Sequence, residues 1–405
     1  MIKKKILIIS AVFPPEQVTS AFLNYDLAHE LAKKCDVTVL RPYPTRPIGA
    51  KFDNVDVEDR SFKTILVDSY THPQSELLGR FKESIDFGRK CAQYIKDHHS
   101  SIDLIYNGGW QLFGLFVVAR VAVRYKIPYI MTVQDIYPES LLTGHKYPSI
   151  IKWFVKSLLL PIDKYYTKHA EKVRTISKEM AEYLSQSRHV PRSHYFVLDN
   201  WQNDEDFRGL KKQSANNNIV FAYVGSINLH SNVDLIIRAF HDAAIPNSEL
   251  LIYGGGNRKK QCEQLVAELK AANIHFGQVS REEVPTIQAN ADVLVLALPK
   301  GNGGLCLPSK MTSYMLSGKP VLASIDKDSA AVRYISEAKC GFAVEPDSLK
   351  ALSDGFIRFG QMSENDLAEM SNNSALFADA NLTRKSNLPK MVAVIEQIIN
   401  DNTKD

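Results

Sequence analysis

The stretch Asp292–Pro320, "DVLVLALPKGNGGLCLPSKMTSYMLSGKP", passes from an apolar strand through a glycine-rich loop into a helix. Its nearly continuous apolar start is typical of a strand in a parallel sheet covered on both faces. Pro308 suits the entry to a helix, and Gly318 suits its end. The loop is therefore predicted to lie at the carboxyl end of a parallel strand, where doubly wound folds bind their ligands.

The predicted helix start after this loop has the features of an anion site. Its free N–H groups and positive dipole end suit a diphosphate. Ser309 adds a hydroxyl group and Lys310 a positive charge, which opposes the helix dipole unless an anion lies nearby. Gly303 and Gly304 would let the backbone approach a ligand closely. The alternative is an ordinary surface loop before a helix.

Strand and helix patterns alternate in both halves of the chain, which at 405 residues is too long for one core. This alternation predicts an α/β protein with two doubly wound, Rossmann-like domains facing a central cleft. A polar stretch marks the boundary between them. The predicted parts are a first domain over residues 1–199, a linker over 200–218, a second domain over 219–385, and a helix in 386–405 that could return to the first domain.

Composition excludes several classes of protein. With 45% hydrophobic and 23% charged residues, the sequence is typical of a globular protein, and no apolar run reaches the roughly 18–20 residues of a membrane span. The five cysteines include no C-x-x-C pair, so neither a disulfide framework nor a zinc site is predicted. A net charge of +4 does not indicate a surface that binds nucleic acid. We expect a cytoplasmic protein that uses no metal.

Two more polar or glycine-rich turns follow predicted strands of the second half. The first lies in "VGSINLHSNVDLIIRAF" and contains Gly225 and Ser226, whereas the second, "IYGGGNRKKQ", contains Gly254 and Arg258. With the loop before Pro308, they indicate a nucleotide-diphosphate site. A Walker A loop and a Gly-x-Gly-x-x-Gly fingerprint are both missing, which disfavours a P-loop or NAD enzyme.

The sequence resembles the retaining glycosyltransferases of family four, which have the GT-B fold. The similarity extends over "KILIISAVFPPEQVTSAFLNYDLAHELAKKCDVTVL", "VQDIYPES" and "VRTISKEMAEYL", the last of which resembles the final strand and helix of the first domain. In the second half it extends over "FAYVGSINLHSNVDLIIRAF", "LIYGGGNRKK", "IHFGQVSREEVPTIQANADVLVLAL", "LPSKMTSYMLSGKPVLAS" and "CGFAVEPDSLKAL". The nearest branch is the "PSK" group of bacterial surface-polysaccharide assembly.

The resemblance implies that the second domain binds a sugar nucleotide. The implied donor-binding residues are Gly225, Ser226, Gly254, Arg258, Gln278, Val279, Gly303, Gly304, Leu305, Ser309, Lys310 and Ser313. Among them Gln278 and Val279 would meet the base and Ser309 and Lys310 the phosphates. The acceptor loop of the first domain would contain Glu16, Gln17 and Thr19.

The sequence departs from the family pattern at three places. The second glutamate of the usual acid pair falls on Ser313, and no acid lies in the loop before it. The usual phosphate-binding arginine and lysine fall on Ser226 and Ser231, and a first-domain histidine is replaced by Gln134. Lys310, helped by Arg258 or Lys259, would then supply the positive charge at the phosphates.

Three segments of the first domain have two interpretations each. Asp135 either binds a substrate hydroxyl group as a catalytic residue or caps the following turn, and Glu16 either contacts the acceptor or is a solvated loop carboxylate. The segment around Lys152, Trp153 and Lys156 either binds an anionic membrane surface or is a packed helix with a solvated lysine face.

The predicted activity is transfer of a sugar from a nucleoside diphosphate sugar to a glycan or polyprenyl-linked glycan, in the synthesis of lipopolysaccharide, capsule or exopolysaccharide. No cofactor is expected. The alternatives are a GT-B-fold sugar-nucleotide epimerase and a catalytically silent protein that binds a sugar nucleotide.

Overall fold

The computed structural model divides the chain into two compact units, Met1–Asp199 with Asn387–Asp405, and Asn200–Ser386. Each unit has its own parallel sheet. The structure describes residues 3–16, 18–46, 51–52, 55–57, 59–72, 76–108, 112–142, 148–210, 212, 218–301 and 307–402.

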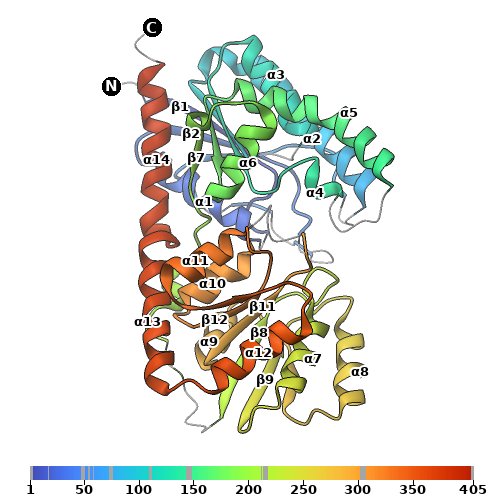
Figure 1. Cartoon of the computed structure of the whole chain (residues 1–405). Helices are drawn as coiled ribbons and strands as arrows, with labels where there is room; N and C mark the ends of the chain where they lie inside the picture. The colour runs from blue at the N-terminus through green and yellow to red at the C-terminus, as the bar shows by residue number, and fades with distance from the viewer. Residues whose placement is uncertain are drawn as a thin grey trace. The chain divides into compact units, whose positions relative to one another are not determined.

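The first unit contains a seven-stranded parallel sheet with the order β3-β2-β1-β4-β5-β6-β7. Figure 1 labels its strands β1, β2 and β7. Its strands are β1 (Lys5–Ser10), β2 (Asp36–Arg41), β3 (Lys63–Leu66), β4 (Leu104–Gly108), β5 (Tyr129–Val133), β6 (Lys172–Thr175) and β7 (Tyr195–Val197). Its helices are α1 (Thr19–Ala32), α2 (Leu77–His98), α3 (Phe113–Arg124), α4 (Glu139–Leu142), α5 (Ser149–His169) and α6 (Lys178–Arg188), with 3₁₀ turns η1 (His99–Ser101) and η2 (Arg192–His194). The strand order reverses between β1 and β4, so the loops after these two strands flank the switch point.

The second unit contains a six-stranded parallel sheet with the order β10-β9-β8-β11-β12-β13. Its strands are β8 (Ile219–Val224), β9 (Ser248–Tyr253), β10 (Ile274–Gly277), β11 (Val293–Ala297), β12 (Val321–Ser324) and β13 (Gly341–Val344). Its helices are α7 (Val233–Ala243), α8 (Lys259–Leu269), α9 (Val284–Asn290), α10 (Ser309–Leu316), α11 (Ala330–Ala338), α12 (Leu349–Gly360) and α13 (Glu364–Asn381), with a 3₁₀ turn η3 (Asp204–Phe207). Here the switch point lies between β8 and β11.

Helices cover both faces of the second sheet because its strands carry apolar side chains on both. On β8, Phe221 and Tyr223 point into one core with α7, α8 and α12, whereas Ala222 and Val224 point into the other with α10 and α11. This arrangement explains why the strand sequences read as continuous apolar runs. The prediction of doubly wound α/β units is confirmed.

The last helix, α14 (Arg384–Asp401), continues from the second unit into the first. Its buried side chains include Met391 and Ile395. Its Glu396 forms an ion pair with Lys34, just after α1, with an N–O distance of 2.8 Å. No helix among the described residues combines the length and apolar character of a membrane span.

The structure differs from the sequence-based description at the sheet edges. β7 follows the segment predicted to hold the last strand of the first unit, and β7, β10 and β13 have only three or four residues each. All three lie at the edge of a sheet, where a strand is covered less completely and its apolar pattern is weaker. The described part of the predicted linker also contains structure, because Trp201 and Asp204 are buried and Asp204 accepts a hydrogen bond from the Arg384 backbone N–H group at 3.2 Å.

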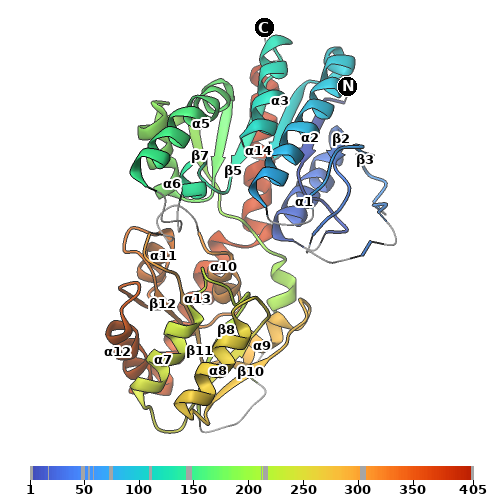
Figure 2. The same cartoon turned by 90° about the vertical axis from the view of Figure 1, so that its right-hand side faces the viewer.

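Helices α2 and α3 lie side by side, as Figure 2 shows, and they are in close contact at two glycines. A Cβ atom on Gly88 would lie 2.7 Å from the Cα atom of Gly114, a backbone atom that cannot move independently. We therefore expect Gly88→Ala to lower the free energy of unfolding by about 1–3 kcal/mol, although alanine favours a helix. Chemical denaturation measures this, and Lys90→Ala on the exposed side of α2 is the matched control, expected within about 0.5 kcal/mol of the parent. A Gly88→Ala protein as stable as the parent would contradict the close contact.

Candidate functional site

The candidate site lies at the carboxyl edge of the second sheet, around the switch point between β8 and β11. The turn after β8 contains Gly225 and Ser226, and the chain after β11 leads to the start of α10 at Ser309. Because β8 and β11 are neighbours, their following segments come together at one place.

Two glycine turns at this edge fit together through contacts that a side chain would block. The Gly225 N–H group donates to Tyr253 O at 2.9 Å, and Gly254 N–H donates to Gly277 O at 3.3 Å. A Cβ atom on Gly254 would lie 2.0 Å from Gly225 O, and Gly254 has a φ of +141° that disfavours other residues. The ends of β8, β9 and β10 are therefore joined into one layer of backbone that a ligand can approach.

Lys310 lies directly on this layer. A Cβ atom on Gly225 would be 2.1 Å from Lys310 Cε, and Lys310 Nζ lies 5.3 Å from the centre of the Tyr223 ring. Lys310 has no carboxylate partner within ion-pair distance among the described residues. Burial lowers the pKa of its ammonium group. A positive charge held in this way suits an anionic ligand.

The start of α10 adds further hydrogen-bond donors beside Lys310. Pro308 precedes the helix, and no side chain in the part of the chain that the structure describes caps it. A buried tyrosine fixes the helix in place, since Tyr314 Oη accepts from the Val224 N–H group at 3.0 Å and lies 3.3 Å from Val295 O. The backbone N–H groups of the first turn are therefore held at the ends of β8 and β11, where they can bind an anion.

Ser313 faces the opposite way. It is buried, its hydroxyl group donates to Lys310 O at 3.0 Å, and it accepts from Gln288 Nε2 at 3.2 Å. Gln288 in turn accepts from Ser317 at 2.6 Å. This network stabilises α10 against α9, so the structure places Ser313 in packing, and its predicted contact with the donor stays a prediction.

The remaining donor-site predictions fall at the same edge of the sheet or outside the described residues. Ser226 and Gln278 are exposed at turns after β8 and β10, and Arg258 comes directly before α8. Ser231 closes its own turn by donating to Asn228 O at 2.8 Å, and Lys259 Nζ lies 3.5 Å from Gly277 O. Val279 packs partly into the core below Gln278. Gly303, Gly304 and Leu305 lie outside the described residues.

Glu16, at the switch point of the first sheet, is not the solvated loop carboxylate that was the alternative from sequence. It is 2% exposed, and its two oxygens accept backbone N–H groups from Phe13 at 3.1 Å, Thr45 at 2.9 Å and Arg46 at 3.0 Å. Burial raises its pKa, while these hydrogen bonds oppose the shift. Glu16 therefore joins the loops after β1 and β2. Gln17 and the side chain of Thr19 lie outside what the structure describes.

Asp135 follows β5, and its side chain is exposed. The loop that contains it is held in place by the buried Arg188. Arg188 donates to both oxygens of Glu139, at 2.9 and 2.8 Å, to Asp163 at 2.5 Å and to the Tyr137 carbonyl at 2.5 Å. Burial would raise the pKa of Glu139, but Arg188 outweighs it and lowers that pKa to about 2. Sequence reasoning missed this arginine, since it lies 49 residues from Glu139 in a helix of ordinary composition.

Comparisons with known proteins agree with this architecture. Two family models match the chain: "Glycosyl transferase 4-like domain" over residues 24–201 and "Glycosyl transferases group 1" over residues 204–376. Together they cover most of the sequence, with one model on each side of the boundary between the two units.

A curated relative and solved structures give the same result. The probable glycosyltransferase WbjE of Pseudomonas aeruginosa is 22% identical over 298 residues, which are 71% of this chain and 72% of WbjE. Anabaena Alr3699/HepE, solved with UDP and glucose, superposes with a TM-score of 0.68 at 14% identity over 97% of this chain and all of HepE. WaaG, a glycosyltransferase involved in lipopolysaccharide biosynthesis, superposes with a TM-score of 0.64 at 17% identity over 96% and 99% of the two chains. At these identities the structures show a shared fold.

The Arg188 network predicts a pH-dependent loss of stability. Arg188→Ala leaves Asp163 buried without its cation and leaves Glu139 with only the partly exposed Lys156 at 3.4 Å, which costs about 3–5 kcal/mol near pH 7. Because the folded pKa of Glu139 is below its usual 4.5, its contribution is full above pH 4.5 and is lost as pH falls toward 2. We therefore expect the difference between parent and variant to shrink below pH 4.5 in denaturation curves. The matched control is Arg89→Ala on the exposed face of α2, and a difference independent of pH would contradict the paired-carboxylate explanation.

Proposed function

We propose a reaction for this chain, which belongs to the glycosyltransferases that combine a 4-like domain with a group 1 domain. The reaction is transfer of one sugar from a nucleoside diphosphate sugar to a hydroxyl group of a growing glycan, with retention at the anomeric carbon. Family membership favours a transferase over the epimerase and the silent binding protein. The environment of Lys310 supports the donor site. Lys310 has no carboxylate partner among the described residues. It lies beside the start of α10, which no described side chain caps.

The chemistry needs charge stabilisation on the leaving diphosphate. The bond between the anomeric carbon and the phosphate oxygen breaks, and a bond to the acceptor oxygen forms on the same face of the sugar. The acceptor's proton passes to the leaving phosphate oxygen, so no side chain is required as a base. Lys310 Nζ and the first N–H groups of α10 would stabilise the negative charge that grows on the diphosphate. The same groups replace a metal ion in the proposed mechanism.

The donor class is proposed from the solved relatives. HepE has been solved with UDP and with UDP-glucose, which makes uridine diphosphate sugars the first donors to test. WaaG is described as acting in lipopolysaccharide biosynthesis, and we propose a glycan or lipid-linked glycan of the cell surface as the acceptor. Within the first unit, the loops joined by Glu16 and the exposed Asp135 are the proposed acceptor contacts.

A membrane surface is the proposed partner of α5. Ile150, Trp153, Phe154 and Leu158 are 61–69% exposed and recur at intervals of one, three and four residues, so they share one side of the helix. This placement does not fit a helix whose apolar residues are all packed. By the same spacing Lys164 and Lys168 lie on this side and add positive charge, as expected for a helix that lies on an anionic lipid surface, whereas Lys152 lies on the opposite side.

A panel of sugar nucleotides, incubated with and without glycan acceptor, tests the proposed reaction. Release of nucleoside diphosphate that depends on the acceptor and survives EDTA is the expected result. Products formed without acceptor would point to the epimerase, and binding without turnover would point to the silent protein. Activity lost in EDTA and restored by manganese would contradict the proposed metal-free mechanism.

Replacing Lys310 tests the donor site. A charge-assisted hydrogen bond to phosphate is worth roughly 1.5–3 kcal/mol, so Lys310→Ala should weaken UDP binding by about 10- to 150-fold. Since the leaving group gains charge in the transition state, kcat should fall as well. Ser309→Ala should cost less because the backbone N–H groups remain, and Lys310→Arg is not expected to restore activity fully. Lys260→Ala on α8 is the matched control, and a Lys310→Ala enzyme within about twofold of the parent would place the diphosphate elsewhere.

Vesicle binding tests the membrane face. Lys168→Glu with Trp153→Ser and Phe154→Ser should reduce sedimentation with vesicles of phosphatidylglycerol and phosphatidylcholine, most clearly at low salt. Lys156 is left in place because it lies 3.4 Å from the buried Glu139 carboxylate. Leu78→Ser removes an apolar side chain of α2 that is even more exposed, at 81%, and should leave binding unchanged. Equal sedimentation of the parent and the triple variant would show that α5 does not bind the surface.

A further inference from the structure

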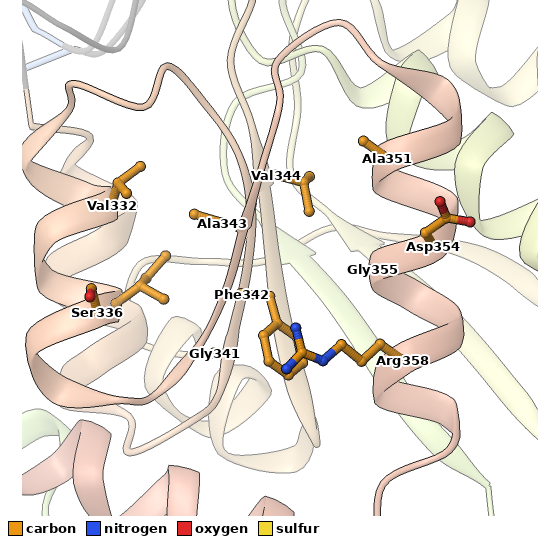
Figure 3. A pocket seen from close by; sticks show the side chains of 11 residues that line it. Val332, Ser336, Gly341, Phe342, Ala343, Val344, Ala351, Asp354, Gly355 and Arg358 are labelled. Carbon is orange, nitrogen blue, oxygen red and sulfur yellow. The ribbon is translucent and has the colours of Figure 1, made fainter.

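A groove runs along the outer edge of the second sheet. It has a volume of about 430 Å³ and is lined by β13 together with α11 on one side and α12 on the other. Figure 3 shows β13 between the two helices, with Val332 and Ser336 on α11 facing Ala351, Asp354 and Arg358 on α12. β13 is the last strand of the sheet order, so the groove lies two strands away from β11 and the donor site.

The floor of this groove presents backbone groups that can pair with another strand. The Val321 N–H group donates to Cys340 O at 2.9 Å, and Ile325 N–H donates to Val344 O at 3.1 Å. With Val321 opposite Gly341 in the parallel register, the ladder to β12 uses Phe342 and Val344. The N–H and C=O groups of Gly341 and Ala343 therefore point away from β12, into the groove.

The shape of the groove determines what can reach these groups. Because α11 and α12 both line it, the edge of β13 lies between two helices. The β13 strand of a second copy would be enclosed by its own α11 and α12, which would meet these helices before the two strands could pair. A single extended segment can enter, because neighbouring strands lie only about 4.8 Å apart.

The side chains around β13 suggest the chemistry of that segment. The Arg358 guanidinium lies 3.6 Å from the centre of the Phe342 ring, and Arg358 has no ion pair among the described residues. The nearby Asp354 is already paired with Lys350 at 2.9 Å. On the α11 side Val332 and Ile335 are apolar, and Ser336 adds one hydroxyl group. The groove thus offers one open positive charge next to apolar surface.

We propose that this groove binds an extended peptide segment of a partner protein, which adds a strand to β13 and carries an acidic group that pairs with Arg358. Backbone hydrogen bonds to Gly341 and Ala343 supply the pairing, as in other cases of strand addition to a sheet edge. Alternate side chains of the peptide pack on α11 and α12, and its carboxylate pairs with the Arg358 guanidinium on the side turned away from the Phe342 ring. The interaction is separate from sugar transfer and does not depend on the proposed donor site.

A library of displayed heptapeptides, selected on the immobilised full-length protein, tests the proposal. We expect enrichment of peptides that contain an acidic residue beside alternating apolar residues. Ala343→Pro removes the N–H group that points into the groove without removing a hydrogen bond to β12, so it should weaken the selected peptides at least tenfold in fluorescence anisotropy. Ala343→Ser keeps that N–H group and should bind as the parent does. Arg358→Glu, an exposed change, should also weaken binding at least tenfold.

The thermal midpoint and UDP affinity of each variant serve as checks on folding, and both should remain those of the parent. If Ala343→Pro lowers the thermal midpoint, Arg358→Glu alone decides the outcome. No enrichment, or selected peptides that bind the parent, Ala343→Pro and Arg358→Glu equally, would overturn the proposal. Peptides that lose affinity only when UDP is present would identify the donor site as their target and would overturn it as well.

Discussion

The nesting of glycine turns at the carboxyl edge of the second sheet is the constraint on which the candidate site depends. Gly254 leaves room for the Gly225 carbonyl, and Gly225 leaves room for the Lys310 side chain. A side chain at either position would separate β9 from β8 or move Lys310 from its place over Tyr223. Tyr314 then fixes the start of α10 to the ends of β8 and β11. One ammonium group and the first N–H groups of a helix thereby lie at the switch point.

Buried charges organise the first unit in a comparable way. Glu16 connects two loops by accepting backbone N–H groups, and Arg188 holds the Asp135 loop by binding Glu139, Asp163 and the Tyr137 carbonyl. Glu16 and Arg188 can affect substrate binding without contacting a substrate, because they position exposed residues that can contact it. Helix α10 likewise contains one residue with a structural role and one available to a ligand. Ser313 stabilises the helix, whereas Lys310 remains open to a ligand.

Much of this architecture could be predicted from sequence, because central parallel strands carry long apolar runs and α10 begins at Pro308. Short edge strands such as β13 lack that signal, since one side of the strand is only partly covered. The burial of Glu16 could not be predicted either, because its partners at Thr45 and Arg46 are backbone groups that any residue provides. Lys310 could be selected as a candidate from sequence because a lysine in the first turn of a helix conflicts with the helix dipole. Arg188 carries no such local conflict, and its role depends on residues brought together only by folding.

The donor site is tested most directly by a crystal structure of the protein with UDP. The diphosphate should lie at the start of α10, with one phosphate oxygen within about 3.2 Å of Lys310 Nζ and another accepting from a backbone N–H group of the first turn. The turn at Gly225 should approach the diphosphate without a side chain between them. A UDP molecule whose phosphates bind elsewhere, with Lys310 still lying over Tyr223 and contacting no ligand atom, would contradict the assignment.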